Sequence, residues 1–314
     1  MESKNEKKEW LESDCSPFSS LYCNLKIRLT GNLNEKNLSD LYNCNLCNQC
    51  GLAGVNQSAR EKAVNKNLIM RHVAEIRENI REYGNSYGET PNYLNPTSKE
   101  KITKTILFRG CTPLYKTPEI LESVENLLKS QNIEYEFMND ENCCGNILFN
   151  LGDNESAQEL VRENIAKLKK SGVKRIITVC PGCYNAFNKY YVGENGFNVE
   201  VILAIDLLSN LTISNKNYVV QESCHGREKT SEVIKVFTNS KEITKNLCCG
   251  AGAGVLAYNE KMAASKANDL IKNNSQKIVT YCPFCYINLS AYSTNIFDIY
   301  VLLDSQYNNI KIID

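Results

Sequence analysis

The chain has 314 residues, which is long enough for two domains and a small additional module, and its 36 basic and 36 acidic side chains leave no net charge. This balance argues against a nucleic-acid partner, or an acidic membrane surface, held by bulk electrostatics. The polar N-terminus and the lack of any run of 18 apolar residues predict no export signal and no membrane span, and hence a cytoplasmic protein.

Fifteen cysteines in such a chain predict metal binding or redox chemistry, because the cytosol keeps thiols reduced and does not favour a disulfide framework. The cysteines fall into three groups along the chain. The first group is Cys15, Cys23, Cys44, Cys47 and Cys50; the second is Cys111, Cys143, Cys144, Cys180 and Cys183; the third is Cys224, Cys248, Cys249, Cys282 and Cys285.

The N-terminal region, residues 1–83, is predicted to be a small helical module. Within it the apolar residues of 58–83 recur at steps of three and four, which predicts one amphipathic helix with a single buried face. Residues 84–101 are rich in Gly, Pro, Asn and Ser and have no hydrophobic period, so we expect a linker there.

Three cysteines of the first group, Cys44, Cys47 and Cys50, have the spacing that begins the ferredoxin run C-x2-C-x2-C-x3-C-P. The fourth cysteine of that run normally serves a second cluster, but Gly54 stands in its place, followed by Val55 where the run has proline. Aligning Cys23 with the last position of a preceding run puts serine at the other three ligand positions of that second cluster, which are Ser13, Ser16 and Ser19.

One cluster site is therefore lost and the other is retained. We expect a single [4Fe-4S] cubane bound by Cys23, Cys44, Cys47 and Cys50, with Cys15 as an alternative to Cys23. Four thiolates also suit a structural zinc ion, although zinc sites usually pair one C-x2-C with another. Three cysteines at successive two-residue spacings favour the cubane.

The second and third groups form an internal repeat with the common pattern C…C-C-G…C-P-x-C. Strands and helices are predicted to alternate in both copies: strands at 103–108, 133–138 and 175–179 with helices at 118–130 and 155–172, then strands at 218–221 and 277–281 with a helix near 258–273. Such alternation predicts an α/β fold with mostly parallel sheets, here as two domains, 102–213 and 214–314.

The cysteines follow the predicted strand ends, where parallel sheets bind their ligands. We therefore expect the five thiols of each copy to share one crevice, and the two crevices to approach each other. Gly145 and Gly250 come directly after the cysteine pairs and either let the backbone approach a cluster or form simple turns. His225, beside Cys224, is expected to orient a ligand through a hydrogen bond.

Both copies resemble the cysteine-rich CCG domain, which occurs in heterodisulfide reductase subunits and in the iron–sulfur subunits of glycolate, lactate and glycerol-3-phosphate oxidising systems. The likeness covers nearly the whole chain and is carried by FRGCTPLY (108–115), ENCCG (141–145), VCPGCYN (179–185), ESCHGR (222–227), CCGAGAG (248–254) and YCPFCYINL (281–289). A ferredoxin-like module ahead of two CCG domains is also the arrangement of that family's iron–sulfur subunits.

The resemblance implies a noncubane [4Fe-4S] cluster in each five-cysteine set, and in some relatives the first set has been suggested to hold zinc. The second set departs in its spacings, x23 and x32 against x31 and x35, which leaves its cluster type open. The implied function is an electron-transferring iron–sulfur subunit of a heterodisulfide-reductase-like or glycolate/lactate-oxidase-like oxidoreductase.

Two alternatives remain: a terminal disulfide or thiol reductase that uses a CCG-bound cluster, and a non-redox assembly protein with zinc in all three sites. The sequence has no flavin or nicotinamide motif, so hydride chemistry is assigned to a partner, expected to be a flavoprotein subunit. A small redox protein or a disulfide is the expected acceptor.

Overall fold

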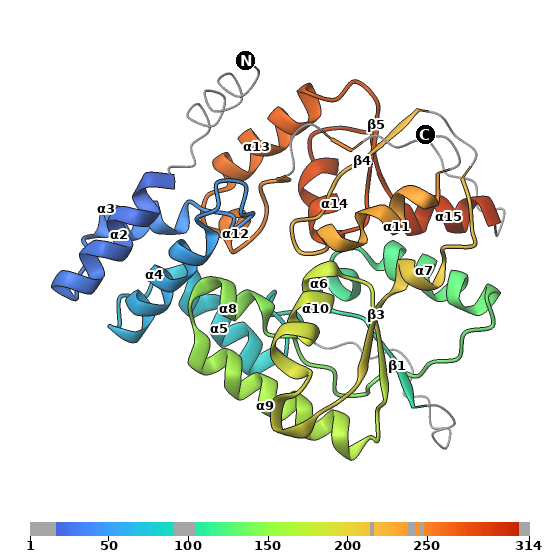
Figure 1. The fold of residues 1–314 in the computed structure, drawn as a ribbon, viewed down its shortest axis with the longest axis horizontal. Helices are drawn as coiled ribbons and strands as arrows, with labels where there is room; N and C mark the ends of the chain where they lie inside the picture. Colours follow the sequence, from blue (N-terminus) through green and yellow to red (C-terminus); the bar gives the residue numbers. More distant parts are fainter. Residues whose placement is uncertain (1–16, 91–103, 214–216, 238–242, 245–247, 308–314) are drawn as a thin grey trace.

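The computed structural model describes residues 17–90, 104–213, 217–237, 243–244 and 248–307. Cys15, Ser13, Ser16 and most of the predicted linker therefore lie outside the described residues. Figure 1 shows the first helices of the chain on the left of the molecule and the two repeats, one above the other, on the right.

Within its described residues, 17–83, the N-terminal module contains four helices: α2 (Pro17–Thr30), α3 (Glu35–Tyr42), α4 (Ala53–Asn65) and α5 (Arg71–Tyr83). The side chain of Asn34 caps α3 by accepting a hydrogen bond from the backbone N–H of Asn37. Gly84 ends α5 in the left-handed conformation, and its N–H donates to the carbonyl of Ile80. Helix α2 packs against α3 and α4.

The prediction of one helix over 58–83 is wrong, because the chain breaks between α4 and α5. Asn67 adopts a left-handed backbone conformation, with φ of +58°, which an α-helix cannot continue through. The apolar face is nevertheless real, since Val64 precedes the break and Val73, Ile76 and Ile80 follow it, and all four are buried. The spacing of apolar residues continues across the turn at Asn67, so this spacing alone does not predict the break in the helix.

The first repeat contains a parallel sheet in the order β1 (Thr105–Phe108), β2 (Arg175–Thr178) and β3 (Glu200–Leu203). Its helices are α6 (Cys111–Tyr115), α7 (Pro118–Ser130), α8 (Asn146–Leu151), α9 (Asn154–Lys170) and α10 (Pro181–Ala186). A π-helical turn, Phe187–Tyr191, and two 3-10 turns, Glu194–Gly196 and Ala204–Leu207, complete it.

The strand predicted at 133–138 is reduced to one parallel bridge, between Glu136 and Ile106 at the edge of the sheet. Its alternating pattern has another cause: Tyr135 and Phe137 pack edge to face with ring centroids 5.5 Å apart, and both contact the core. The alternation of apolar and acidic residues in this segment therefore reflects the burial of the apolar side chains, and only one residue pair forms a β-bridge.

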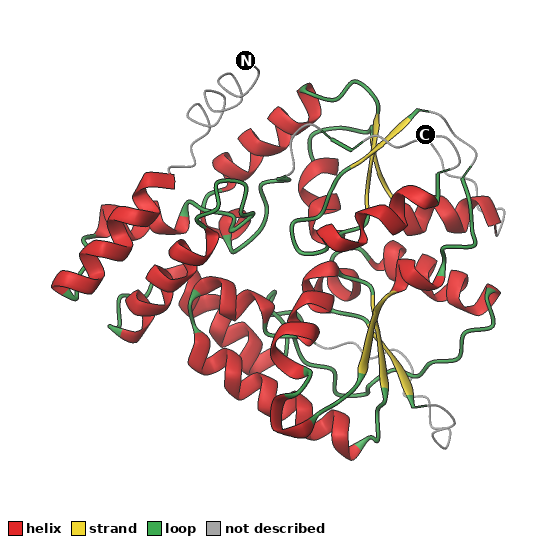
Figure 2. Ribbon diagram, in the orientation of Figure 1, coloured by secondary structure: helices red, strands yellow, loops and turns green. Residues whose placement is uncertain are grey.

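The second repeat follows the same plan, with the parallel order β4 (Tyr218–Val220), β5 (Lys277–Thr280) and β6 (Ile296–Asp298). Its helical elements are a 3-10 turn, Arg227–Lys229, and α11 (Thr230–Lys235), α12 (Val255–Tyr258), α13 (Glu260–Lys272), α14 (Pro283–Ser290) and α15 (Ile299–Tyr307). The two sheets confirm the predicted α/β fold, and Figure 2 shows helices beside each of them.

The hydrophobic cores cross the boundaries between these parts. One core contains residues of all four module helices together with α8 and α9, and the other contains residues of both sheets. Helix α15 of the second repeat packs directly on α7 of the first. No helix within the described ranges is both long and apolar enough to cross a membrane.

Candidate metal centres

Ten cysteines, which are all five of each repeat, line one cavity of about 200 Å3. The first set contributes Cys111, Cys143, Cys144, Cys180 and Cys183, and the second contributes Cys224, Cys248, Cys249, Cys282 and Cys285. The structure thus brings each predicted set together and places both sets in the same cavity. All fourteen described cysteines are free thiols.

The ends of the strands position these thiols. Cys111 opens α6 shortly after β1, and Cys180 immediately precedes Pro181 at the start of α10 after β2. In the second repeat Cys282 likewise precedes Pro283 at the start of α14 after β5. Proline suits the first turn of a helix, because the N–H that it lacks has no partner within the helix there.

Within the first set the thiols contact one another. Hydrogen bonds from Cys143 and Cys183 lower the pKa of Cys144 to about 6. Cys183 also bonds Cys180, and its pKa is raised by these bonds and by burial. A site that already holds one thiol near its thiolate form suits a metal, since only the thiolate binds one.

The second set repeats the arrangement and touches the first. Hydrogen bonds from Cys180 of the first set and Cys285 of its own set lower the pKa of Cys282 well below its usual value. Cys285 in turn bonds Cys249. The Cys180–Cys282 contact confirms that the two crevices approach each other.

The two glycines hold equivalent places. Gly145 and Gly250 both have positive φ, +81° and +90°, and the N–H of each donates to the sulfur of the first cysteine of its pair, Cys143 or Cys248, over 3.4 Å. Hydrogen bonds to cluster sulfurs are one of the means by which proteins set cluster potentials. A role of these glycines in cofactor binding stays a prediction.

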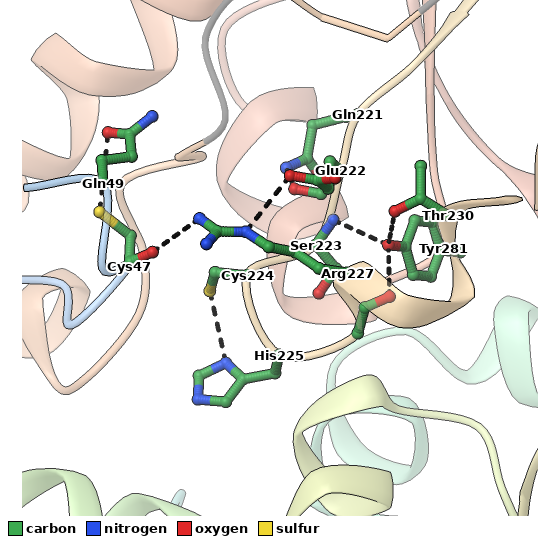
Figure 3. Close-up of polar contacts among 11 residues, drawn as sticks. Cys47, Gln49, Gln221, Glu222, Ser223, Cys224, His225, Arg227, Thr230 and Tyr281 are labelled. Atoms are coloured by element: carbon green, nitrogen blue, oxygen red, sulfur yellow. Dashed lines mark hydrogen bonds and ion pairs between the residues drawn. The ribbon is translucent and has the colours of Figure 1, made fainter. Parts of the chain in front are cut away.

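Figure 3 shows the end of β4, where His225 and Cys224 share a hydrogen bond of 3.4 Å between Nδ1 and Sγ. Burial lowers the pKa of His225, which favours the neutral ring. Tyr281 fixes the loop, because its hydroxyl donates to the carbonyl of Gly226 and accepts from the N–H of Ser223. The contact is the one expected of an orienting histidine, and the role itself is untested.

The loop that carries Cys44, Cys47 and Cys50 lies against the second repeat. A hydrogen bond from Cys248 lowers the pKa of Cys47 to about 6. The guanidinium of Arg227 donates to the carbonyl of Cys47 over 2.8 Å, as Figure 3 shows. The side-chain amide of Asn45 donates to the carbonyls of Gly250 and Gly252.

Cys23 is placed apart from this contact. It is fully buried on the inner face of α2, where its thiol donates to the carbonyl of Asn37 over 3.3 Å. Burial, and then the charge of Asp40, raise the pKa of Cys23. The grouping of Cys23 with Cys44, Cys47 and Cys50 in one cubane stays a prediction, and Cys50 is exposed.

The chemistry of the cavity fits iron–sulfur ligation. Five cysteines per set, close enough to contact one another, and backbone N–H groups that donate to sulfur suit a thiolate-bound cluster. In the described part of the chain no three His, Cys, Asp or Glu side chains are placed as ligands of a single metal ion. A cluster spreads its thiolates over several irons.

Two further groups of residues contact the cysteine sites without any signal in the sequence. Ser86 and Tyr87, in the predicted linker, line the cavity, and Ser86 lies 3.6 Å from the sulfur of Cys111. Arg60 and Arg227 contact the cysteine loops from other elements. Linker composition and isolated arginines carry no local signal of such contacts, which depend on packing between distant segments.

Comparison with known proteins gives the same assignment. The model of the CCG cysteine-rich domain matches residues 105–188 and 218–290. One component of the dihydromethanophenazine:CoB–CoM heterodisulfide reductase of Methanosarcina barkeri is 26% identical over 303 residues, which span 82% of this chain and 74% of that protein.

Two other relatives are longer. An uncharacterized iron–sulfur protein of Methanocaldococcus jannaschii is 24% identical over 281 residues, or 78% of this chain and 56% of that protein. The EtfAB:quinone oxidoreductase of Syntrophomonas wolfei is 26% identical over 253 residues, or 67% and 35%. The two domain matches, each coinciding with one cysteine set, show that the chain belongs to the CCG cysteine-rich domain family.

Proposed function

We propose that this chain is an iron–sulfur electron-transfer subunit of an oxidoreductase of the heterodisulfide reductase type. The observation that carries the proposal is the single cavity lined by both cysteine sets, with Cys180 and Cys282 in contact. The relatives named as heterodisulfide reductase and quinone oxidoreductase support it. The proposal includes a glycolate or lactate oxidase function and a cytoplasmic location.

Three ligand sets would hold the clusters. The CCG sets would each bind one noncubane [4Fe-4S] cluster, and Cys23, Cys44, Cys47 and Cys50 would bind a cubane. Bound clusters of this kind accept and donate single electrons. The chain's own residues keep the site in place: Arg227 and Asn45 hold the Cys44–Cys50 loop against the second repeat, and Tyr281 holds the Cys224 loop.

A partner subunit follows from this chemistry. A substrate such as a 2-hydroxy acid gives up two electrons as a hydride, which single-electron clusters do not accept, whereas a flavin accepts the pair and releases the electrons singly. We therefore propose a flavoprotein partner. The relative named as a component of a heterodisulfide reductase is consistent with a partner of some kind.

A second candidate function is a terminal disulfide reductase. It is favoured by the shared cavity, because a disulfide placed there would face both cysteine sets at once. Reduction of a small disulfide by the isolated chain, supplied with a one-electron donor, would assign the activity to this chain. Turnover only in the presence of a flavoprotein would assign it to the electron-transfer role.

The decisive experiment is anaerobic purification followed by iron, sulfide and zinc analysis and EPR. We expect iron and sulfide in all three sites of the wild-type chain. Cys47→Ala should remove the cubane signal, and Cys183→Ala and Cys285→Ala should each remove one CCG cluster. Cys15→Ser tests the alternative fourth ligand: the cubane signal should stay unchanged if Cys23 is the ligand and should be lost if Cys15 is. Zinc without sulfide would contradict the proposal and support the non-redox alternative.

A further inference from the structure

Arg60 is a fully buried cation at the meeting point of the three cysteine regions. It lies on α4, and its side chain is 0% exposed. Its guanidinium donates to four backbone carbonyls, those of Leu41 (3.2 Å), Cys44 (2.6 Å), Asn150 (2.9 Å) and Ala253 (3.0 Å). These carbonyls belong to the module, to α8 of the first repeat and to the CCG loop of the second.

All four acceptors are neutral. No carboxylate within the described residues forms an ion pair with Arg60, and its Nε has no hydrogen-bond partner there. The ring of Tyr42, 4.7 Å from the guanidinium carbon, offers only its π face. Arginine keeps its proton even when buried. Burying its charge therefore costs free energy unless an anion lies nearby.

The nearest region that could supply an anion is the cysteine loop itself. Arg60 bonds the carbonyl of Cys44, and a negative charge on the Cys44 sulfur opposes the burial that lowers the pKa of Arg60. Four thiolates on a [4Fe-4S] core carry more negative charge than the core carries positive charge. A cubane held by this loop is therefore the anion that the buried guanidinium lacks.

We propose that Arg60 is the counter-cation of the cubane, a positioning residue that holds the Cys44 loop and raises the cluster's reduction potential. The inference rests on the proposed function, since it requires the cubane to be bound. A nearby positive charge favours the reduced, more negative form of the cluster. Its removal should make the cluster harder to reduce.

Arg227 provides a matched control. It also donates to a backbone carbonyl of the loop, that of Cys47, over 2.8 Å. Unlike Arg60, it faces a carboxylate, because its Nε lies 3.2 Å from the carboxylate of Glu222. Neutralising Arg227 therefore removes a charge that is already compensated.

The test is an anaerobic redox titration of the cubane EPR signal in the full chain, with iron and sulfide content measured on each sample. Arg60→Gln should make the reduction equilibrium at least tenfold less favourable, a fall of about 59 mV or more for a one-electron couple. Arg60→Lys keeps the charge and should titrate close to wild type. Arg227→Gln should shift the midpoint much less than Arg60→Gln.

Each outcome decides. If the Arg60→Gln chain does not bind the cubane, Arg60→Met is the second neutral variant. If only Arg60→Lys binds it, the cluster requires a positive charge at this position, which supports the inference. Equal reduction midpoints in wild type and the neutral variants would overturn the inference, and so would the failure of all three variants to bind the cubane, because this would indicate a purely structural role. A wild-type chain without a cubane signal would contradict the proposed function instead.

Discussion

Gly145 and Gly250 hold equivalent positions in the two repeats, but a methyl group would meet different surroundings. At Gly250 an added Cβ would lie 2.6 Å from the carbonyl oxygen of Ala263, whereas at Gly145 the nearest atom, on Leu160, is 3.6 Å away. Both residues have positive φ, which costs an L-residue about 1–2 kcal/mol. We expect Gly145→Ala to cost about that much and Gly250→Ala clearly more, measured as shifts of the denaturant midpoint under anaerobic conditions. Equal shifts would show that the backbone at 250 relaxes.

His72 should make stability depend on pH. It stacks on Tyr258 at 4.7 Å and meets Tyr42 edge-on, and burial lowers its pKa from 6.5 to about 4. Between these values the unfolded chain binds the proton and the folded chain does not, so stability is complete above pH 6.5 and falls as the pH approaches 4. The loss is at most about 3 kcal/mol, at 1.36 kcal/mol per pKa unit.

The measurement for His72 is a comparison of wild type and His72→Gln at several pH values between 4 and 7. The difference in their free energies of unfolding should change across this window, because glutamine does not titrate. Acid loss of the clusters affects both proteins and cancels in the difference. A difference that is constant with pH would show that His72 titrates normally in the folded chain.

At the scale of elements, the sequence predicts those helices and strands whose bounds are set by a local residue pattern. The helix predicted at 118–130 is α7, Pro118–Ser130, because proline marks its start and a continuous apolar face fills its length. The strands β3 and β6 were not predicted: each has only three or four residues and carries no cysteine or turn signal. The break at Asn67 and the single bridge at Glu136 depend on backbone conformation and edge pairing, which hydrophobic periodicity does not encode.

Helix α2 presents an exposed apolar face. Half of the ten large apolar side chains that are exposed in the described residues lie on this helix: Phe18, Leu21, Tyr22, Leu25 and Leu29. The opposite face of α2 carries Cys23, a predicted cubane ligand, so a redox partner bound here would lie close to the cluster. Exposed apolar patches of this kind commonly mark protein interfaces.

We expect Leu25→Glu to weaken binding of the proposed flavoprotein partner at least tenfold, which is about 1.4 kcal/mol, because a carboxylate would be buried against apolar surface. Tyr292→Glu, at an exposed apolar position of the second repeat, is the control and should bind as wild type does. The measurement is co-purification from the native organism, followed by titration of the purified partner. If the chain alone dimerises and Leu25→Glu makes it monomeric, the face binds a second copy instead.

At the scale of the whole molecule, the sequence predicted the cysteine sets but not how they join. The order of strands and cysteines was sufficient to expect five thiols in one crevice, because parallel strands end at the same edge. The junctions rest on residues without a motif: Arg60 bonds three regions, and Tyr258 donates to the Ser39 hydroxyl across a separation of 219 residues. Such contacts follow from the packing of complete elements. The domain boundaries at 83, 101 and 213 stay predictions.

The contacts between sulfurs give the three cysteine groups an order in space. Cys47 of the module contacts Cys248 of the second set, and Cys282 of the second set contacts Cys180 of the first. The second set therefore lies between the module and the first set, although it comes last in the sequence. A paramagnetic cluster broadens the EPR signal of a neighbour more strongly when it is closer.

We therefore expect the EPR signal of the proposed cubane, once reduced, to be broadened mainly by the cluster proposed for the second set. Cys285→Ala, which removes a ligand of the second set, should sharpen that signal and lower the microwave power needed to saturate it. Cys183→Ala, the equivalent change in the first set, should leave the signal close to wild type. Both variants lose one buried thiol from α14 or α10, so a general loss of packing would affect them alike. Sharpening by Cys183→Ala alone would place the first set next to the module, against the Cys47–Cys248 contact.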